Sequence, residues 1–476
     1  MKKIYSFLIS LFFFVFLYSS FSQNIKTELN VVGDEFSYEK YSSYNPEITP
    51  QQYETLDKRC AENIRLLGLN ESKKSTTSTL FNWPLKAATG FTDCSYYIVT
   101  AYVDENTSSG AINDYNCGTN TYDGHQGTDL CIWPFPFYKM DNNQVDVIAA
   151  AAGTILDKAD GNFDRNCASN SLTANYVIIK HADGSCALYW HMKSGSVTTK
   201  AIGQPISVGE YLGVVGSSGS STGPHLHFEV WTGTTSSTYI DPYYGTCNTL
   251  TSHSWWASQK TYTEPAILKA SVHITDAVIP HCDTTETPNE STSFQVPFQG
   301  PGLSPGYAKF YIFIRDEVSG TTVNLSILNP GGSVFNSWSL NCNNNYNGSY
   351  WCWSKLLPTI PGTYTFQAIY NGTTCSQNFN ITTAAGISTI TDAEKFQISP
   401  NPAGNTFNII GEGIENGNYK FILENIFGQT IAAEDADIEN NLLQKVFSVS
   451  ELSKGMYLLI IDTDKTRVVK KIIIQY

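Results

Sequence analysis

The sequence predicts an all-β protein built from several domains. Tyrosine and glycine are abundant, with 28 and 35 residues, whereas charged residues make up only 15% of the chain. Such a composition favours strands and turns over helices. Short apolar or alternating runs, separated by Gly, Pro, Asn and Asp, recur along most of the sequence. A chain of 476 residues is too long for one ordinary core, so we expect two to four domains.

Residues 1–22 have the pattern of a secretory signal peptide. A basic start, Met1–Lys3, precedes the apolar stretch Ile4–Tyr18 and a small-x-small cleavage sequence, Ser20–Ser22. The apolar stretch is short for a membrane anchor, so we expect export with cleavage. No other stretch of the sequence could span a bilayer.

Residues 23–80 are expected to be a leader or pro-segment that contains one helix. Thr49 is a typical N-cap, Pro50 suits the first helical position, and Gln52 completes a capping box. Gly68 marks the end of the helix. Apolar side chains recur between these ends at helical spacing: Leu56, Cys60, Ile64 and Leu67.

Residues 81–250 are predicted to form an antiparallel sheet or barrel, because short strands are separated by Gly and Asn/Asp turns. The candidate strands are Val147–Ala151, Gly153–Lys158, Tyr176–His181, Ala187–His191, Tyr211–Gly216 and His225–Trp231.

Two further β units are expected. Residues 265–383 have the length and pattern of an immunoglobulin-like sandwich. Residues 393–476 follow the polar linker Thr382–Glu394 and form a small C-terminal β-sandwich. Three tryptophans of the middle unit are either a ligand platform or, more simply, core and edge packing: Trp338, Trp351 and Trp353.

Eleven cysteines in an exported chain predict disulfides. The odd count means that at least one is unpaired or is lost with a removed segment, and Cys60 is the natural candidate for the latter. No Cys-x-x-Cys sequence is present, which argues against cysteine as a zinc ligand. The pairs that we expect are Cys117–Cys131, Cys167–Cys186, Cys342–Cys352 and Cys282–Cys375.

A metal site is indicated by two pairs of residues. Residues 223–230 alternate so that His225 and His227 share one strand face with Glu229. About a hundred residues upstream, His125 and Asp129 are four apart and share a face in a strand or a helix. A catalytic zinc needs three protein ligands and one open position, which His125, Asp129 and one of His225 and His227 can supply.

Two imidazoles and one carboxylate would leave a bound zinc ion with net positive charge, which lowers the pKa of a bound water from about 15.7 toward 7 and polarises a carbonyl. Peptide hydrolysis also needs a base and donors for the oxyanion. No His-Glu-x-x-His helix supplies that base, so the remaining histidines, among them His191, must do so.

Three segments resemble the lysostaphin/LytM-type zinc endopeptidases: Gly124–Asp129, Tyr189–His191 and Ser221–Glu229. The resemblance covers roughly residues 110–245 and implies a small antiparallel sheet with a groove across one face. It implies cleavage of peptide bonds in peptidoglycan stems or cross-bridges, often glycine-containing ones.

The same resemblance implies one Zn²⁺ per chain, bound by His125, Asp129 and His227. It implies that His191 and His225 activate the water and stabilise the oxyanion. Glu229 is expected either to support the metal ligands or to form a structural salt bridge. Tyr189, which an alternating strand places on the face of His191, is expected either to line the groove or to pack in the core.

Two stretches, residues 131–145 and 160–171, are longer than a minimal member of that family has, and we expect both to rim the groove. Four histidines match no position of the family pattern and are expected to be ordinary surface residues: His181, His253, His273 and His281.

The C-terminal unit resembles the sorting domains of type IX secretion substrates. The resemblance rests on Phe396–Ala403, Asn425–Gln429, Leu452–Ile460 and the Lys/Ile-rich end. It implies export across an outer membrane by a secretion machinery, followed by release or surface attachment. The alternative is an ordinary β adhesion module.

Together these patterns predict a secreted or cell-surface zinc metalloendopeptidase that hydrolyses the peptides of bacterial peptidoglycan. The alternatives are a secreted protease of glycine-rich extracellular proteins and a non-catalytic wall-binding or adhesion protein. No basic patch suits nucleic acid, because the net charge is −14. The leader is hypothesised to be inhibitory, with one of its side chains at the fourth zinc position.

Overall fold

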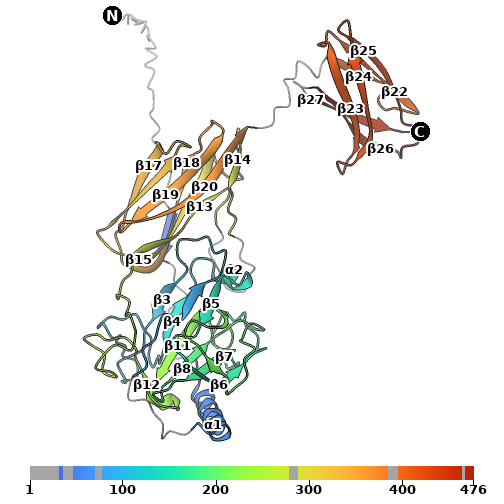
Figure 1. Cartoon of the computed structure of the whole chain (residues 1–476). Coiled ribbons are helices and arrows are strands. Elements are labelled where there is room, and N and C mark those ends of the chain that lie inside the picture. Colours follow the sequence, from blue (N-terminus) through green and yellow to red (C-terminus); the bar gives the residue numbers. More distant parts are fainter. Residues whose placement is uncertain are drawn as a thin grey trace, which may run out of the picture.

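The computed structural model describes residues 32–35, 47–69, 78–277, 288–383, 395–463 and 467–475. These residues are predominantly strands and form three separate β units (Figure 1). The all-β fold class is therefore confirmed. The predicted signal peptide, residues 1–22, and His281 lie outside the described residues. Within the described part, no helix is both long and apolar enough to cross a membrane.

The first unit is built on an antiparallel sheet with the strand order β3-β4-β11-β8-β7-β6-β9, to which β12 adds beside β11. The strands are β3 (Ile98–Ala101), β4 (Thr128–Cys131), β6 (Gly153–Ala159), β7 (Tyr176–Lys180), β8 (Cys186–Trp190), β9 (Pro205–Ile206), β11 (His225–Trp231) and β12 (Tyr239–Ile240).

A second, smaller sheet of the same unit has the order β10-β5-β2. Its strands are β2 (Leu85–Ala87), β5 (Val145–Ile148) and β10 (Tyr211–Val214), and the unit also contains α2 (Pro136–Asp141) and the short helix η2 (Ser236–Thr238). Residues from both sheets share one core, to which Leu226, Phe228 and Val230 of β11 contribute. Alternation along β11 therefore buries its apolar face and directs the His/His/Glu face to the other side.

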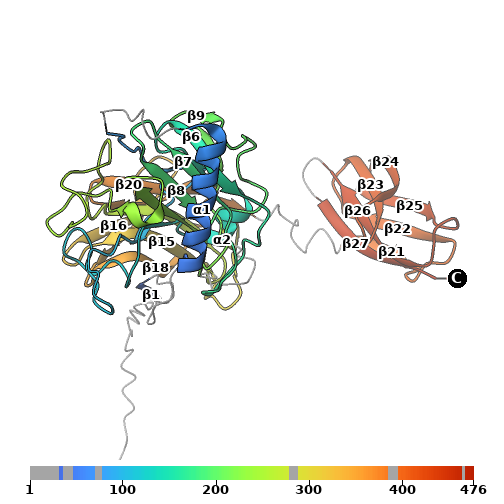
Figure 2. The ribbon, with the colours of Figure 1, turned by 90° about the horizontal axis from the view of Figure 1, so that it is seen from below.

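The leader contributes the helix α1 (Pro50–Leu67), which packs on that other side. The predicted capping box is present: Thr49 Oγ1 accepts from Gln52 N at 3.3 Å, and Gln52 Oε1 accepts from Thr49 N at 2.8 Å. Gly68 ends the helix with a φ of 62°, in the left-handed region that favours glycine. Seen from below, α1 runs across the sheet past β8, β7 and β6 (Figure 2).

Leader residues complete a second core beneath α1. Ile48, Leu56 and Cys60 pack against a sheet face rich in large apolar side chains. The residues on that face are Leu156, Ala174, Tyr176, Ile178, Cys186, Leu188, Trp190 and Trp231.

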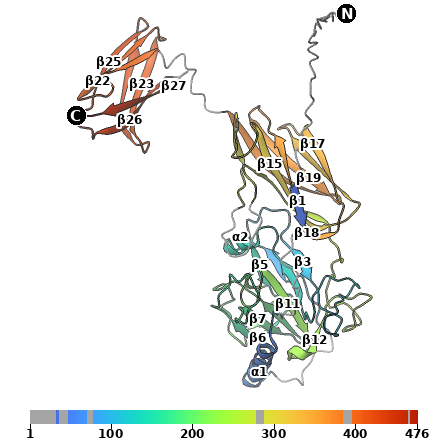
Figure 3. The ribbon, with the colours of Figure 1, turned by 180° about the vertical axis from the view of Figure 1, so that it is seen from behind.

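The second unit is a sandwich of two sheets, with the orders β1-β18-β15-β13 and β14-β20-β19-β16-β17. Its strands are β1 (Val32–Glu35), β13 (Ala266–His273), β14 (Ser293–Val296), β15 (Tyr307–Glu317), β16 (Thr322–Leu328), β17 (Val334–Asn341), β18 (Tyr346–Leu356), β19 (Gly362–Tyr370) and β20 (Thr373–Thr383). The leader strand β1 pairs antiparallel with β18 at the edge of one sheet (Figure 3).

The tryptophans of the sandwich act as packing residues. Trp353 lies in the core, and Trp338 and Trp351 are partly buried against it. The simpler of the two expectations, core and edge packing, fits these positions.

The third unit has its own core and two sheets, with the orders β21-β22-β25 and β24-β23-β26-β27. Its strands are β21 (Phe396–Ser399), β22 (Thr406–Glu412), β23 (Gly417–Asn425), β24 (Thr430–Ile438), β25 (Leu442–Ser448), β26 (Gly455–Asp462) and β27 (Arg467–Ile474).

All four predicted disulfide pairs are wrong. The structure joins Cys94 to Cys375 and Cys117 to Cys247. Sequence neighbours do not pair because strands direct them to different cores. Cys342, for example, lies in the sandwich interior, whereas Cys352 faces the first unit. Cys167 is disulfide-bonded, but not to Cys186, because Cys186 is a free thiol, as are Cys60, Cys342 and Cys352.

Residues 131–145 do not rim a groove as expected. Trp133 and Phe135 are buried against Phe313 of the sandwich, so this stretch forms the apolar junction between the first two units. In the second long stretch, Arg165 and Ala168 form bridges to Ser217 and Ser221, which precede β11.

The disulfide Cys94–Cys375 joins the first unit to the sandwich across 281 residues of sequence. We expect Cys375→Ala to lower the free energy of unfolding by about 2–5 kcal/mol, because the crosslink restricts the unfolded chain. Denaturant unfolding measures this change, and the Cys94→Ala/Cys375→Ala double variant should lose no more than the single variant. Equal stability of Cys375→Ala and the unmodified chain would contradict the pairing, as would peptide mapping that links Cys375 to another cysteine.

Candidate metal centre

The register of two neighbouring strands brings the predicted ligands together. In the β4–β11 ladder, His227 lies directly opposite Asp129, and His225 lies opposite Cys131. Paired residues of an antiparallel ladder project to the same face. His125 lies in the turn that leads into β4. Glycine is needed at position 127 of this turn, because a Cβ there would lie 2.7 Å from the His227 ring.

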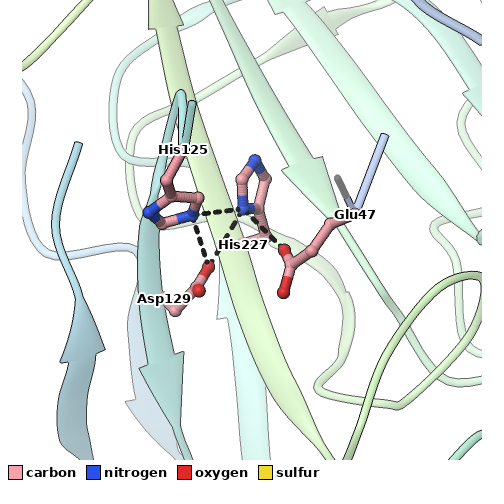
Figure 4. A group of neighbouring side chains, drawn as sticks. All are labelled: Glu47, His125, Asp129 and His227. Atoms are coloured by element: carbon pink, nitrogen blue, oxygen red, sulfur yellow. Dashed lines mark hydrogen bonds and ion pairs between the residues drawn. The ribbon is translucent and has the colours of Figure 1, made fainter. Parts of the chain in front are cut away.

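Three ligand atoms converge at this place. His125 Nε2 lies 3.1 Å from Asp129 Oδ1 and 3.1 Å from His227 Nδ1, and His227 Nδ1 lies 2.9 Å from Asp129 Oδ1 (Figure 4). All three side chains are buried. A fourth residue, Glu47 of the leader, has its Oε2 2.9 Å from His227 Nδ1 and belongs to the same cluster.

The hydrogen bonds around the cluster fit a metal ion. His125 Nδ1 donates to the carbonyl of Tyr102 at 2.6 Å, which leaves Nε2 with a free lone pair directed into the cluster. His227 Nε2 lies 2.8 Å from Glu229 Oε1 and donates to it, which likewise leaves Nδ1 free. Two imidazole lone pairs and a carboxylate at one point are the donor set that zinc takes in catalytic sites.

Glu229 therefore contacts a candidate ligand, as the first of its two expected roles requires. Its carboxylate also accepts from the indole Nε1 of Trp231 at 2.7 Å and from the Tyr53 hydroxyl at 2.5 Å. These contacts fix the His227 ring, since the orientation and tautomer of a metal-binding histidine depend on the partner of its other nitrogen.

His191 and His225 lie beside the cluster with their rings 4.5 Å apart. Each has its Nδ1 tied to a backbone carbonyl, Ser218 O at 2.6 Å and Gly223 O at 2.8 Å respectively. Their Nε2 atoms both face Glu47, at 3.1 Å from Oε2 and 3.3 Å from Oε1. The five predicted site residues thus meet at one place.

His191 reaches this face through an unusual backbone conformation. The strand β8 ends at Trp190, and His191 has a φ of 69°, which side chains other than glycine rarely adopt. Alternation alone would place His191 on the face of Tyr189, but Tyr189 packs in the core and its hydroxyl accepts from Ala150 N at 2.8 Å. The core expectation for Tyr189 is confirmed, and its placement on the His191 face is wrong.

The electrostatics of the cluster depend on the leader. Burial alone would lower the pKa of His225, but the Glu47 carboxylate raises it to about 9. Burial and the neighbouring His225 lower the pKa of His191. Burial and Glu47 oppose ionisation of Asp129, yet His125 and His227 hold the pKa of this carboxyl well below its usual range. The pKa values of the two histidines beside the cluster are therefore shifted in opposite directions while Glu47 is present.

Two of the remaining histidines are not surface residues as expected. His181 is buried with its Nδ1 2.8 Å from the carbonyl of Ala152, and His273 is buried beside Ser271. His181 follows β7 and His273 ends β13, so each packs where its strand enters a core. His253 is exposed as expected.

Comparison with known proteins matches the stretch that contains this site to a protein family. Residues 125–242 match the family described as Peptidase family M23, and residues 397–475 match the Secretion system C-terminal sorting domain. The chain carries an M23 metalloendopeptidase domain and a sorting domain. The sorting domain indicates export through the type IX secretion system to the cell surface or the extracellular space.

The chain is similar over short stretches to curated proteins. It is 34% identical over 89 residues to the cell division protein DipM of Caulobacter vibrioides, covering 19% of this chain and 14% of that protein. It is 32% identical over 84 residues to the peptidoglycan DD-endopeptidase ShyC of Vibrio cholerae, covering 18% of each. It is 49% identical over 55 residues to the DD-carboxypeptidase/endopeptidase Mpg of Neisseria meningitidis, covering 12% of each. The chain thus spans less than a fifth of the length of these relatives.

Two solved structures are matched with low similarity scores. Lysostaphin of Staphylococcus simulans is matched with a TM-score of 0.23 and 18% identity, over 58% of this chain and 86% of that one. A zinc-containing peptidase of Vibrio cholerae is matched with a TM-score of 0.22 and 21% identity, over 34% and 39% of the two chains.

Metal analysis of single variants tests the ligand set. We expect His125→Ala, Asp129→Ala and His227→Ala to lose most bound zinc, since each removes one of the converging atoms. His191→Ala and His225→Ala should keep most of it and serve as matched controls. Loss of zinc in His225→Ala together with its retention in His227→Ala would reverse the assignment within that pair.

Proposed function

We propose that the mature protein is a secreted zinc metalloendopeptidase that hydrolyses peptide bonds of bacterial peptidoglycan, in its stems or cross-bridges. The observation that carries the proposal is the convergence of His125, Asp129 and His227, with His191 and His225 beside them. The similarity to the peptidoglycan DD-endopeptidase ShyC supports the substrate class. The domain order, with a sorting domain at the C-terminus, supports action outside the cell that makes the protein.

Each side chain has a role in this proposal. His125, Asp129 and His227 hold one Zn²⁺, which when bound polarises the scissile carbonyl and acidifies a water. His191 and His225 face the same point with their Nε2 atoms, so one takes the proton of the water and the other donates to the oxyanion. Glu229 keeps the His227 ring in the orientation that binding needs.

We also propose that the leader keeps the precursor inactive. The Glu47 carboxylate lies within hydrogen-bond reach of three histidines of the site, at the position where water and substrate would bind. Its side chain is only 3% exposed, and α1 covers the sheet face that continues from the site. A carboxylate is also a zinc ligand, so Glu47 completes the coordination that catalysis needs open.

Clearing of purified peptidoglycan tests the activity. The precursor cut within residues 70–77 and then separated from the leader should clear the suspension, and a chelator should stop the clearing. His191→Ala should reduce turnover by at least ~10²-fold, because a base or oxyanion donor is removed. Mass spectrometry of the released peptides identifies the bond. Absence of clearing by protein that contains one zinc per chain would reject peptidoglycan and favour glycine-rich proteins as substrates.

The role of Glu47 is tested in the full-length chain. We expect Glu47→Ala to raise hydrolysis relative to the unmodified precursor, and Glu62→Ala to leave it unchanged, because the exposed Glu62 pairs with Arg65 of the same helix. Visible absorption of the Co²⁺-substituted protein should also change on Glu47→Ala, since one ligand is lost. Equal activity of the precursor and of the cut form from which the leader has been separated would refute the inhibitory leader.

A further inference from the structure

A second charged contact of the leader lies away from the metal cluster. Arg59 of α1 binds Asp157 of β6 through two parallel hydrogen bonds, Nε to Oδ2 and Nη2 to Oδ1, both of 2.8 Å. The Asp157 side chain is fully buried, whereas that of Arg59 is half exposed. This bidentate geometry is the strong and directional form of an Arg–carboxylate pair.

The sheet register places Asp157 in line with the metal face. Asp157 lies opposite Ile178, Ile178 opposite Leu188, and Leu188 opposite Glu229. Directly opposed residues project to one face, and neighbouring strands are about 4.8 Å apart, so three steps span about 14 Å. His227 is two residues further along β11, and an extended peptide bridges the whole distance with about four to five residues.

Asp157 loses most of its partners when the leader leaves. Arg59 and Asn63, which both donate to its carboxylate, belong to α1. The peptidase unit itself supplies one donor, the hydroxyl of Tyr176 at 2.7 Å. A carboxylate on a largely apolar and aromatic floor is costly without a compensating charge. The open sheet therefore presents an anion whose preferred partner is an ammonium or guanidinium group.

The leader follows one path across the face and makes a polar contact at each stage. Glu47 meets the metal cluster, Tyr53 donates to Glu229, and Arg59 binds Asp157. A substrate that reaches both the metal and β6 must occupy the same path, because α1 covers the floor between them.

We propose that Asp157 is a specificity site that binds a cationic group of the substrate, about four to five extended residues from the scissile bond. In the precursor, Arg59 occupies this site in place of the substrate. The proposal rests on the endopeptidase function proposed above. The free amine of a diamino acid in a wall peptide and a Lys or Arg side chain of a protein share the chemistry that Asp157 recognises.

The experiment uses the full chain with Glu47→Ala and Arg59→Ala in the leader and a protease sequence introduced within residues 70–77, cut before assay. Two peptides that differ only in Lys against norleucine are compared, together with peptidoglycan whose amines are free or acetylated. Both members of a pair are assayed with the same enzyme preparation. Incomplete release of the leader therefore lowers both kcat/KM values equally and does not change their ratio. Asp157→Asn is tested beside Asp146→Asn, a carboxylate variant on the smaller sheet.

We expect kcat/KM to favour the lysine peptide by about tenfold or more, the effect of one hydrogen bond to a charged group. Asp157→Asn should bring the ratio to about one without slowing the norleucine peptide, and Asp146→Asn should leave the ratio unchanged. An equal rate for the two peptides in the parent protein would overturn the proposal, and this comparison needs no variant at position 157. Equal slowing of both peptides by Asp157→Asn would also overturn it and leave a structural role.

Acetylation separates the two sources of the cation. Slower clearing of acetylated peptidoglycan identifies the wall amine, whereas a preference limited to the lysine peptide identifies a protein side chain. Calorimetric binding of both peptides to the same chain with His191→Ala requires no turnover. Tighter binding of the lysine peptide that Asp157→Asn abolishes would establish the cation site even if no preparation hydrolysed a peptide, in which case the endopeptidase function alone would fail.

Discussion

The pairing of β4 with β11 is the constraint on which the site depends. It sets Asp129 opposite His227 and places His225 one step along the same face. A shift of this register by one residue would send both histidines into the core and Leu226 and Phe228 to the metal face. The buried apolar side of β11 prevents such a shift, so the hydrophobic core that holds the sheet together also fixes the ligand geometry.

The sheet face that carries the site is buried only while another segment covers it. Trp190, Trp231 and Tyr176 are almost completely shielded from water, and part of this shielding comes from a helix of the leader. Without the leader, these side chains would form a large exposed apolar patch, and such patches normally mark a binding surface. Under the function proposed above, the same side chains would contact the leader in the precursor and a substrate after the leader has left.

Several features of the fold followed directly from local sequence. The strict alternation of residues 225–231 matched β11 at both ends, and the capping box at Thr49 and Gln52 located the start of α1. Both signals are short-range, since the side chains that cause them lie within a few residues. The proximity of the site residues could also be predicted, because the residue spacing in the family pattern is set by the strands of this sheet.

Other features depended on contacts that no local pattern encodes. Glu47 meets His191 across 144 residues of sequence, and an isolated glutamate in a polar leader carries no signal of that contact. The positive φ of His191 ended the alternation that was expected to continue from Tyr189. Disulfide pairing failed for the same reason, because Cys94 and Cys375 belong to different units and meet only when these units pack.

The strand β1 gives the leader a second attachment, since it pairs with β18 of the sandwich while α1 packs on the peptidase unit. A cut after α1 therefore leaves the leader bound as a bivalent ligand. After either attachment opens, the other holds the free segment at a high effective concentration, and rebinding competes with escape. If the leader is inhibitory as proposed, proteolysis and release would be separate events, and the delay between them would give an exported precursor time to travel from its producer before it became active.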